Sequence, residues 1–443
     1  MTANRTSLHR LFDSLEYLVD DQVGIIQFVL EAPRQPGSPD FFHYFAQACN
    51  TQSFCAQTNF GKTGGASADP GTAMAKAIGE GIERYCAAIY DLSELPLYSY
   101  ANAPFQCVPP SDFALLSPEQ YQRPGMLFVP FEEHTPVRWV PAHDPLTNER
   151  WHVPAAMVYV PYIFHRGQGD SPIAQSISTG LACHCSYAEA AISAICEVIE
   201  RDAFTITWQA MLAHPQINVE SLSARNRDLV ARFEKAGYTV TLFDMTLDVG
   251  VPTILAVSRS TRLDAPPLVP AGSASLDPEE AVRKSLEELE HTREYCHKIM
   301  IHFPRLPDDP GYASVEDQTG HLNFWCNHAN ARLADFLFTS PARKNFDEIP
   351  NLATDDPDKD LEILLRQVRK VNHRALLCDL TTPDVRDAGL AVVRAIIPGF
   401  HPLVVGHSIR ALGGNRLWTI PQKLGYPGIT RETGDNPVPH PYP

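Results

Sequence analysis

A five-residue charged motif occurs twice in this chain, and this repetition is the feature that most constrains the fold. Residues 76–86 read KAIGEGIERYC and residues 195–204 read ICEVIERDAF, so Glu-x-x-Glu-Arg appears in two stretches rich in Ala and Ile. Residues three and four positions apart lie on the same face of an α-helix. Each stretch therefore predicts a helix with two carboxylates and an arginine on one face, and apolar side chains on another.

Two interpretations of these helices compete. The motif can be a solvent-exposed face in which Glu and Arg form an intrahelical ion pair. Against this, the flanking residues are small or apolar, the motif is repeated, and buried carboxylates are costly unless cations compensate them. Magnesium binds oxygen ligands and shares its coordination shell with substrate phosphates. The repetition therefore favours a nucleoside triphosphate held through Mg²⁺ by four carboxylates, those of Glu80, Glu83, Glu197 and Glu200.

Composition places the chain among ordinary globular proteins. Its 443 residues, 44% hydrophobic and 20% charged, predict a large core and roughly two or three domain-sized units. The net charge of −16 argues against a generic nucleic-acid surface, which needs clustered Lys and Arg, but it allows an anionic ligand in a pocket. The amino terminus does not resemble a signal peptide, and no segment offers eighteen uncharged apolar residues. We therefore expect a cytoplasmic protein with no membrane contact.

The ten cysteines are then expected to be reduced thiols, most of them core residues. Cys183 and Cys185 form a C-x-C with no second pair nearby, which is weak evidence for zinc. Because they precede the second charged helix, they are candidates to line a site.

Alternating helical and strand-like patterns predict an α/β fold. A short helix at 8–18 and a strand at 23–30 are expected first, and residues 153–162 read as a buried strand. Further helices are expected at 222–236, 278–298 and 356–370, and strands at 239–244, 252–258, 373–379 and 391–397. In the helix at 278–298, Lys284, Glu288 and His291 share one face, although its composition is also that of an ordinary surface helix.

The sequence around Lys62-Thr63 invites comparison with a phosphate-binding P-loop. With Gly61 as the second glycine, the motif G-x-x-x-x-G-K-[ST] would require glycine at position 56, but Ala56 stands there and Gln57 follows it. We reject a Walker site. Asp69-Pro70 still predicts a helix start, whose exposed amides can meet phosphate.

The last nine residues, DNPVPHPYP, place Pro at every second position from 437 to 443. Such a run cannot form a helix or a central strand, and predicts an extended polyproline segment. A disordered end is one interpretation. The other is a stiff segment that reaches into a site at low entropic cost.

These features together resemble the YcaO superfamily, and within it the cyclodehydratases that form thiazoline and oxazoline rings in ribosomal peptides. The resemblance runs from about residue 58 to the last residue and rests on GEGIERYC, STGLACHCSYAEAAISAICEVIERDAF, the helix after Asp277-Pro278, residues 378–417 and the terminal Pro-x-Pro-x-Pro. It implies a YcaO-type fold of two related α/β halves with mixed sheets and an ATP site between helices. The implied division is an N-terminal α/β segment at 1–57, a YcaO domain at 58–434 and a proline-rich tail at 435–443.

The resemblance also assigns roles to individual residues. It implies that ATP and Mg²⁺ are the cofactors, with Glu80, Glu83, Glu197 and Glu200 as metal ligands. Nucleotide contacts are implied for Lys76, Ser178, Thr179, Gly180, Cys185, Arg201, Lys284 and Glu288. A base must also take the amide proton, and our hypothesis for this catalytic role is the carboxylate of Pro443 or the side chain of His440. Several positions depart from the family pattern: relatives often carry Gly-Asn in place of His184-Cys185, Arg in place of Lys284, Gln in place of His291 and Ser in place of Lys76.

The implied reaction phosphorylates a peptide amide oxygen with ATP, while a neighbouring Cys, Ser or Thr side chain attacks the amide carbon. The implied partners are a ribosomally made precursor peptide and a separately encoded protein that binds its leader, and a homodimer is possible. Two alternatives stay open. One is formation of a thioamide or amidine by an external nucleophile, and the other is an accessory role in modifying a ribosomal protein.

Overall fold

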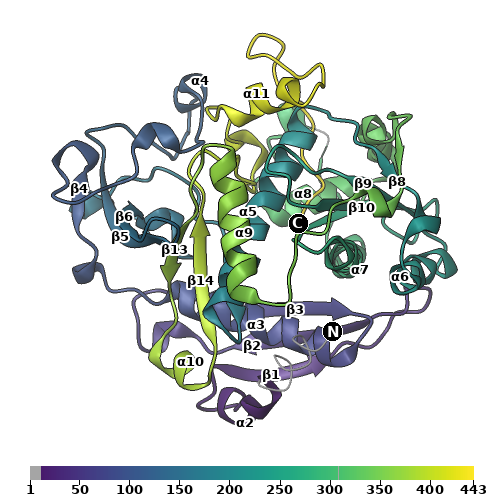
Figure 1. The fold of residues 1–443 in the computed structure, drawn as a ribbon, viewed down its shortest axis with the longest axis horizontal. Coiled ribbons are helices and arrows are strands. Elements are labelled where there is room, and N and C mark those ends of the chain that lie inside the picture. Colours follow the sequence, from purple (N-terminus) through teal and green to yellow (C-terminus); the bar gives the residue numbers. More distant parts are fainter. Residues whose placement is uncertain (1–10, 308) are drawn as a thin grey trace.

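The computed structural model describes residues 11–307 and 309–443, which form three β-sheets with long helices between them (Figure 1). The first sheet is antiparallel and has the order β1 (Ile26–Glu31), β2 (Phe42–Ala48), β3 (Lys62–Ser67). The second has the order β11 (Leu268–Ala274), β10 (Thr253–Arg259), β9 (Thr239–Asp244), β8 (Gln216–Ile217), β12 (Arg343–Lys344). It is mixed, because β8 and β12 pair in parallel while its other pairs are antiparallel.

The third sheet has the order β4 (Leu97–Ser99), β5 (Pro136–Asp144), β13 (Leu376–Asp379), β14 (Ala391–Ile396), β7 (Leu181–His184), with β6 (Glu149–Pro154) paired to β5. It joins strands from the middle and from the last quarter of the chain, because β14 pairs with β7. The α/β class predicted from the sequence is confirmed.

Three long helices lie between the sheets: α3 (Pro70–Ala88), α5 (Tyr187–Gln209) and α7 (Pro278–His302). Each helix begins after an N-cap residue whose side chain accepts a hydrogen bond from a backbone N–H of the first turn. The caps are Asp69 for α3, Ser186 for α5 and Asp277 for α7. Proline follows the cap in α3 and α7, where its missing N–H costs nothing. The chain therefore encodes the start of each helix locally.

These helices connect the sheets to one another. Helix α3 covers β2 and β3, α7 packs on β10, β11 and β3, and α5 contacts β14, β7 and β11. In Figure 1, α5 runs through the centre of the molecule, α3 lies beneath it and α7 is seen nearly end-on beside it. The shorter helices lie around this centre: α2 (Leu15–Leu18), α4 (Pro118–Tyr121), α6 (Ala224–Lys235), α8 (Gln318–Trp325), α9 (Pro357–Lys370), α10 (Pro383–Asp387) and α11 (Arg416–Lys423).

Most predicted elements coincide with observed ones. The helices expected at 222–236, 278–298 and 356–370 are α6, α7 and α9, and the four strands expected after residue 238 are β9, β10, β13 and β14. The helix expected at 8–18 falls partly outside the described residues, and its described part contains α2.

The buried strand predicted at 153–162 is wrong. Strand β6 ends at Pro154, and a 3₁₀ turn over Ala155–Met157 follows. Proline has no N–H for a strand ladder, so Pro154 and Pro161 limit this apolar run to a strand end and a loop. Its side chains are still mostly buried, which explains the strand-like pattern.

The boundary predicted at residue 57 falls between β2 and β3, which pair along their length in one sheet. At the other end, the tail from Asp435 has neither helix nor strand, as its prolines predict, yet its penultimate residue Tyr442 is fully buried in a core cluster with α5 and α11. Among the helices of the described residues, none has the length and apolar character needed to cross a membrane.

Candidate functional site

The α3 copy of the charged motif lies against β3 and β7. Glu80 accepts a hydrogen bond from Gly64 N of β3 at 3.2 Å and pairs with Arg84 at 3.0 Å. Glu83 accepts a hydrogen bond from Cys183 N of β7 at 2.9 Å, with Arg84 at 3.8 Å from its other oxygen. Backbone amides from two different sheets therefore fix the carboxylates of this helix.

The α5 copy is fixed in the same way by the turn before β7. Glu197 Oε2 accepts a hydrogen bond from Gly180 N at 3.0 Å, and its Oε1 lies 3.4 Å from Arg201. Glycine is required at this turn because φ is +86° and an added Cβ would lie 2.4 Å from Ala395 O. Residues 180–183 thus bind one carboxylate from each charged helix, Glu197 through Gly180 and Glu83 through Cys183.

The pKa values of these carboxyl groups reflect burial and the charges of neighbours on both helices. Burial raises the pKa of Glu83 to about 8; Arg84 opposes the rise, while Glu80 and Glu197 of α5 add to it. Burial likewise raises the pKa of Glu200 to about 7, with Arg201 and Tyr442 opposing it. Carboxyls that retain protons near neutral pH lack enough positive charge around them, so a divalent cation fits here.

Helix α7 forms the third side of the site. Lys284, Glu288 and His291 lie on its partly exposed face, as the sequence predicts, with His291 Nδ1 3.8 Å from Glu288 Oε1. The negative charge of Glu288 contributes to the raised pKa of Glu200 on α5. A Cβ added at Gly64 would lie 2.8 Å from His291 Nε2, so this histidine adjoins the amide that binds Glu80.

The other predicted nucleotide contacts lie around this centre. Ser178 O accepts the N–H of Leu181 in the turn before β7, and Thr179 lines a cavity beside α5. Cys185 N donates to His184 Nδ1 at 3.0 Å. Lys76 pairs with Glu287 of α7 at 2.8 Å and also donates to Ala66 O at 3.1 Å, so it joins α3 to α7.

The tail reaches the site through a residue that the sequence analysis did not select. Tyr442 is fully buried, and its hydroxyl donates to Glu200 Oε1 at 2.6 Å while accepting from Gly272 N at 2.7 Å and Arg201 Nη1 at 3.1 Å. Arg201 also pairs with Glu200 directly. A bulky polar aromatic between two prolines was the available sequence signal, because a buried tyrosine hydroxyl needs a partner.

The two predicted catalytic residues flank Tyr442. The ring of His440 stacks on His321 at 3.9 Å, and its Nε2 donates to Val404 O at 3.1 Å. Burial lowers the pKa of His440 to about 4, which makes it a weak base at neutral pH. Pro443, the last residue of the tail, is partly exposed.

A complete metal cage is absent from the described part of the chain, where no three His, Cys, Asp or Glu side chains are placed to hold one ion. Magnesium does not require such a cage, since it usually takes one or two carboxylates and completes its octahedron with phosphate oxygens and water. The separated pairs on α3 and α5 fit metal ions that are shared with a triphosphate.

Comparison with known proteins agrees with this geometry. Residues 64–401 match the family model described as YcaO cyclodehydratase, ATP- and Mg²⁺-binding. The chain belongs to the YcaO family. An uncharacterized protein of Methanothermobacter thermautotrophicus is 33% identical over 313 residues, which are 68% of this chain and 76% of that protein.

Two solved structures resemble this YcaO chain throughout. A heterocyclase in complex with substrate and cofactor aligns with a TM-score of 0.80 at 20% identity, over 98% of this chain and 57% of that one. The YcaO protein of Methanopyrus kandleri, bound with AMPPCP and Mg²⁺, aligns with a TM-score of 0.63 at 19% identity, over 88% and 90% of the two chains. The YcaO fold is thus confirmed, and the chain spans little more than half of the heterocyclase. ATP and Mg²⁺, predicted from the sequence, are the cofactors of the family.

Proposed function

We propose that this YcaO protein is an ATP-dependent peptide cyclodehydratase that forms thiazoline or oxazoline rings from Cys, Ser or Thr in a ribosomal precursor peptide. The observation that carries the proposal is the pairing of Glu83 and Glu197, from two helices, on the amides of Cys183 and Gly180. Such pre-positioned carboxylates with raised pKa values suit metal ions that bridge to phosphate.

Each side chain has a distinct task in this proposal. Glu80, Glu83, Glu197 and Glu200 hold Mg²⁺, and the hydrogen bonds from Gly64, Cys183, Gly180 and Tyr442 orient them. Arg201 and Lys284 offset phosphate charge. ATP, when bound, supplies the phosphoryl group that turns the amide oxygen into a leaving group.

The overall reaction removes the elements of water from the peptide. The side-chain sulfur or oxygen forms a bond to the amide carbon and loses its proton, and the amide oxygen leaves as part of inorganic phosphate. The amide nitrogen loses its proton as the C=N bond of the ring forms, so a base is needed. We propose that the tail supplies this base, through the carboxylate of Pro443 or the ring of His440.

Partners complete the proposal. This chain aligns with 57% of a heterocyclase that was solved in complex with substrate and cofactor. We propose that a separately encoded protein binds the precursor's leader and delivers the core peptide to this cytoplasmic enzyme, which can act as a homodimer.

The test is mass spectrometry of a precursor peptide incubated with the protein, ATP and Mg²⁺, with and without a leader-binding protein encoded beside it. Loss of one water mass per ring supports cyclodehydration. Replacement of oxygen by sulfur would instead show thioamide formation, which uses the same ATP site with an external nucleophile. ATP turnover that stays at background with every peptide and partner would favour an accessory role in ribosomal-protein modification.

The matched control compares two glutamates in the same assay. Glu197→Gln removes a proposed magnesium ligand and should abolish ring formation and Mg²⁺-dependent nucleotide binding. Glu362→Gln, on the exposed face of α9, removes only a surface pair with Arg366 and should have no effect. Equal activity of the two variants would refute the metal assignment.

A further inference from the structure

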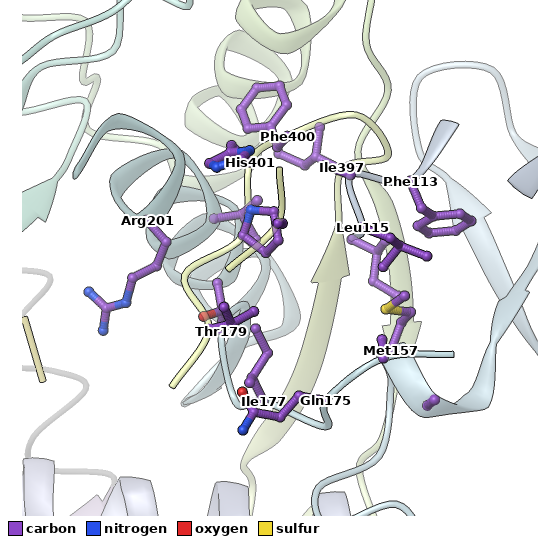
Figure 2. A pocket seen from close by; sticks show the side chains of 18 of the residues that line it. Phe113, Leu115, Met157, Gln175, Ile177, Thr179, Arg201, Ile397, Phe400 and His401 are labelled. Carbon is purple, nitrogen blue, oxygen red and sulfur yellow. The ribbon is translucent and has the colours of Figure 1, made fainter. Parts of the chain in front are cut away.

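A largely apolar cavity of about 120 Å³ adjoins the carboxylate site. Its walls come from the loops at 113–116 and 173–179, from β14 and the residues after it, and from Val198 and Arg201 of α5. Figure 2 shows Phe113, Leu115 and Met157 on one side and Thr179 and Arg201 on the other. Arg201 lines this cavity and also pairs with Glu197 and Glu200, so the cavity lies next to the proposed magnesium ligands of α5.

Arg394 of β14 is the unusual member of this wall. It is 4% exposed, yet its Nε and Nη1 atoms find no hydrogen-bond partner among the described residues. Burial lowers its pKa to about 10, with the charge of Glu197 opposing the change, so the side chain stays charged at neutral pH. Buried donors are nearly always satisfied, and an unsatisfied one beside a cavity points to a ligand that supplies the acceptor.

The cavity also limits what that ligand can be. A volume of ~150 Å³ lined by Leu, Ile and Phe accommodates benzene in other proteins, so the space here is comparable to an aliphatic side chain and too small for an indole without rearrangement. Its lining is mostly aliphatic and aromatic carbon, with Arg394, Arg201 and Thr179 toward α5. A peptide with an apolar side chain matches this lining, because the side chain suits the apolar walls and the backbone oxygens suit the polar groups.

We propose that this cavity is a subsite for the peptide beside the residue that the enzyme modifies, an inference that rests on the proposed function. An aliphatic side chain directly beside the modified residue enters the apolar space. The free nitrogens of Arg394 donate to backbone oxygens of the same peptide segment, next to the metal-bound phosphates. The enzyme therefore prefers Val, Leu or Ile beside the residue that it cyclises.

Peptide binding tests this without requiring turnover. The probes are fluorescein-labelled pentapeptides with the patterns Gly-Gly-X-Cys-Gly and Gly-Gly-Cys-X-Gly, where X is Gly, Leu or Trp. Fluorescence anisotropy is measured with the full chain, ADP and Mg²⁺. In one of the two patterns we expect Leu to bind about tenfold or more tightly than Gly, and Trp to gain no such advantage.

Substitutions at two positions separate the apolar part of the subsite from its guanidinium. Ala174→Leu fills the cavity from a partly exposed loop position and should remove the Leu preference. Arg394→Gln should weaken all peptides alike, with partial recovery in Arg394→Lys. Ala101→Leu is the control, because residue 101 is exposed and does not line the cavity. Binding of a non-hydrolysable ATP analogue should stay within about twofold of wild type in Ala174→Leu, and this also reports that the variant is folded.

Equal binding of Leu and Gly peptides in both patterns would overturn the inference, as would a Leu preference that survives in Ala174→Leu. Either result leaves the proposed function standing, because ring formation is read separately by mass. Absence of any ring formation would refute the proposed function even if a Leu preference were found.

Discussion

The hydroxyl of Tyr442 offers the sharpest test of how the tail supports the site. Tyr442→Phe removes one oxygen and keeps the buried ring in place against Phe204, whose centroid lies 4.0 Å away. That oxygen serves three partners, the carboxylate of Glu200, the amide of Gly272 and the guanidinium of Arg201. The substitution therefore isolates polar contacts from packing.

The expected cost follows from these contacts. The buried amide of Gly272 loses its acceptor, which should lower the free energy of unfolding by about 1–3 kcal/mol. Glu200 loses a hydrogen bond that opposes the burial-driven rise of its pKa, so this pKa should rise above its value of about 7. A larger fraction of Glu200 is then protonated at neutral pH and is unavailable to Mg²⁺.

Denaturant unfolding measures the loss of stability. Calorimetric titration of a non-hydrolysable ATP analogue with Mg²⁺ measures the loss of nucleotide affinity. The loss of nucleotide affinity should be larger at pH 6.5 than at pH 8.5, because higher pH restores the ionised carboxylate. Tyr426→Phe is the matched control, since among the side chains of the described residues its hydroxyl contacts only the ring of His214, at 3.0 Å. Unchanged stability and affinity in Tyr442→Phe at both pH values would refute this account of the tail.

Three further outcomes are expected. Gly180→Ala should be destabilised by about 1–3 kcal/mol and should bind Mg²⁺-nucleotide more weakly, because its Cβ would lie 2.4 Å from Ala395 O and displace the amide that binds Glu197, a proposed magnesium ligand; denaturant unfolding and nucleotide titration measure the two effects. Burial alone would raise the pKa of Glu287, but Lys76 and other partners lower it to about 2, so its stabilising effect is present above pH 4.5 and is lost as pH falls toward 2. Glu287→Gln should accordingly be less stable at pH 7 and show a shallower loss of stability with acid in denaturant melts. Glu83→Gln should remove the larger part of the proton release that accompanies Mg²⁺-nucleotide binding near pH 7.5 and leave the smaller part from Glu200, measured in two buffers of different ionisation enthalpy, since the pKa of Glu83 is raised to about 8 and that of Glu200 to about 7.

The sequence by itself determined the features that depend on residues close together in the chain, namely the helix faces and the helix starts. Helical periodicity placed Glu80 with Glu83 and Glu197 with Glu200, and the Asp-Pro pairs marked the starts of α3 and α7. The same local reasoning failed at 153–162, where buried apolar residues resembled a strand although proline ended the ladder. The prolines predicted that the tail is extended, but they did not predict that its Tyr442 side chain is buried.

Only the tertiary structure decided which groups complete the site. The amide of Cys183 meets Glu83 across 100 residues, and the hydroxyl of Tyr442 meets Glu200 across 242. No spacing pattern encodes such pairs, because they arise where a sheet, two helices and a tail pack together. Arg394 is the clearest case: within a strand it reads as an ordinary residue, and its free guanidinium nitrogens become informative only once the cavity beside them exists.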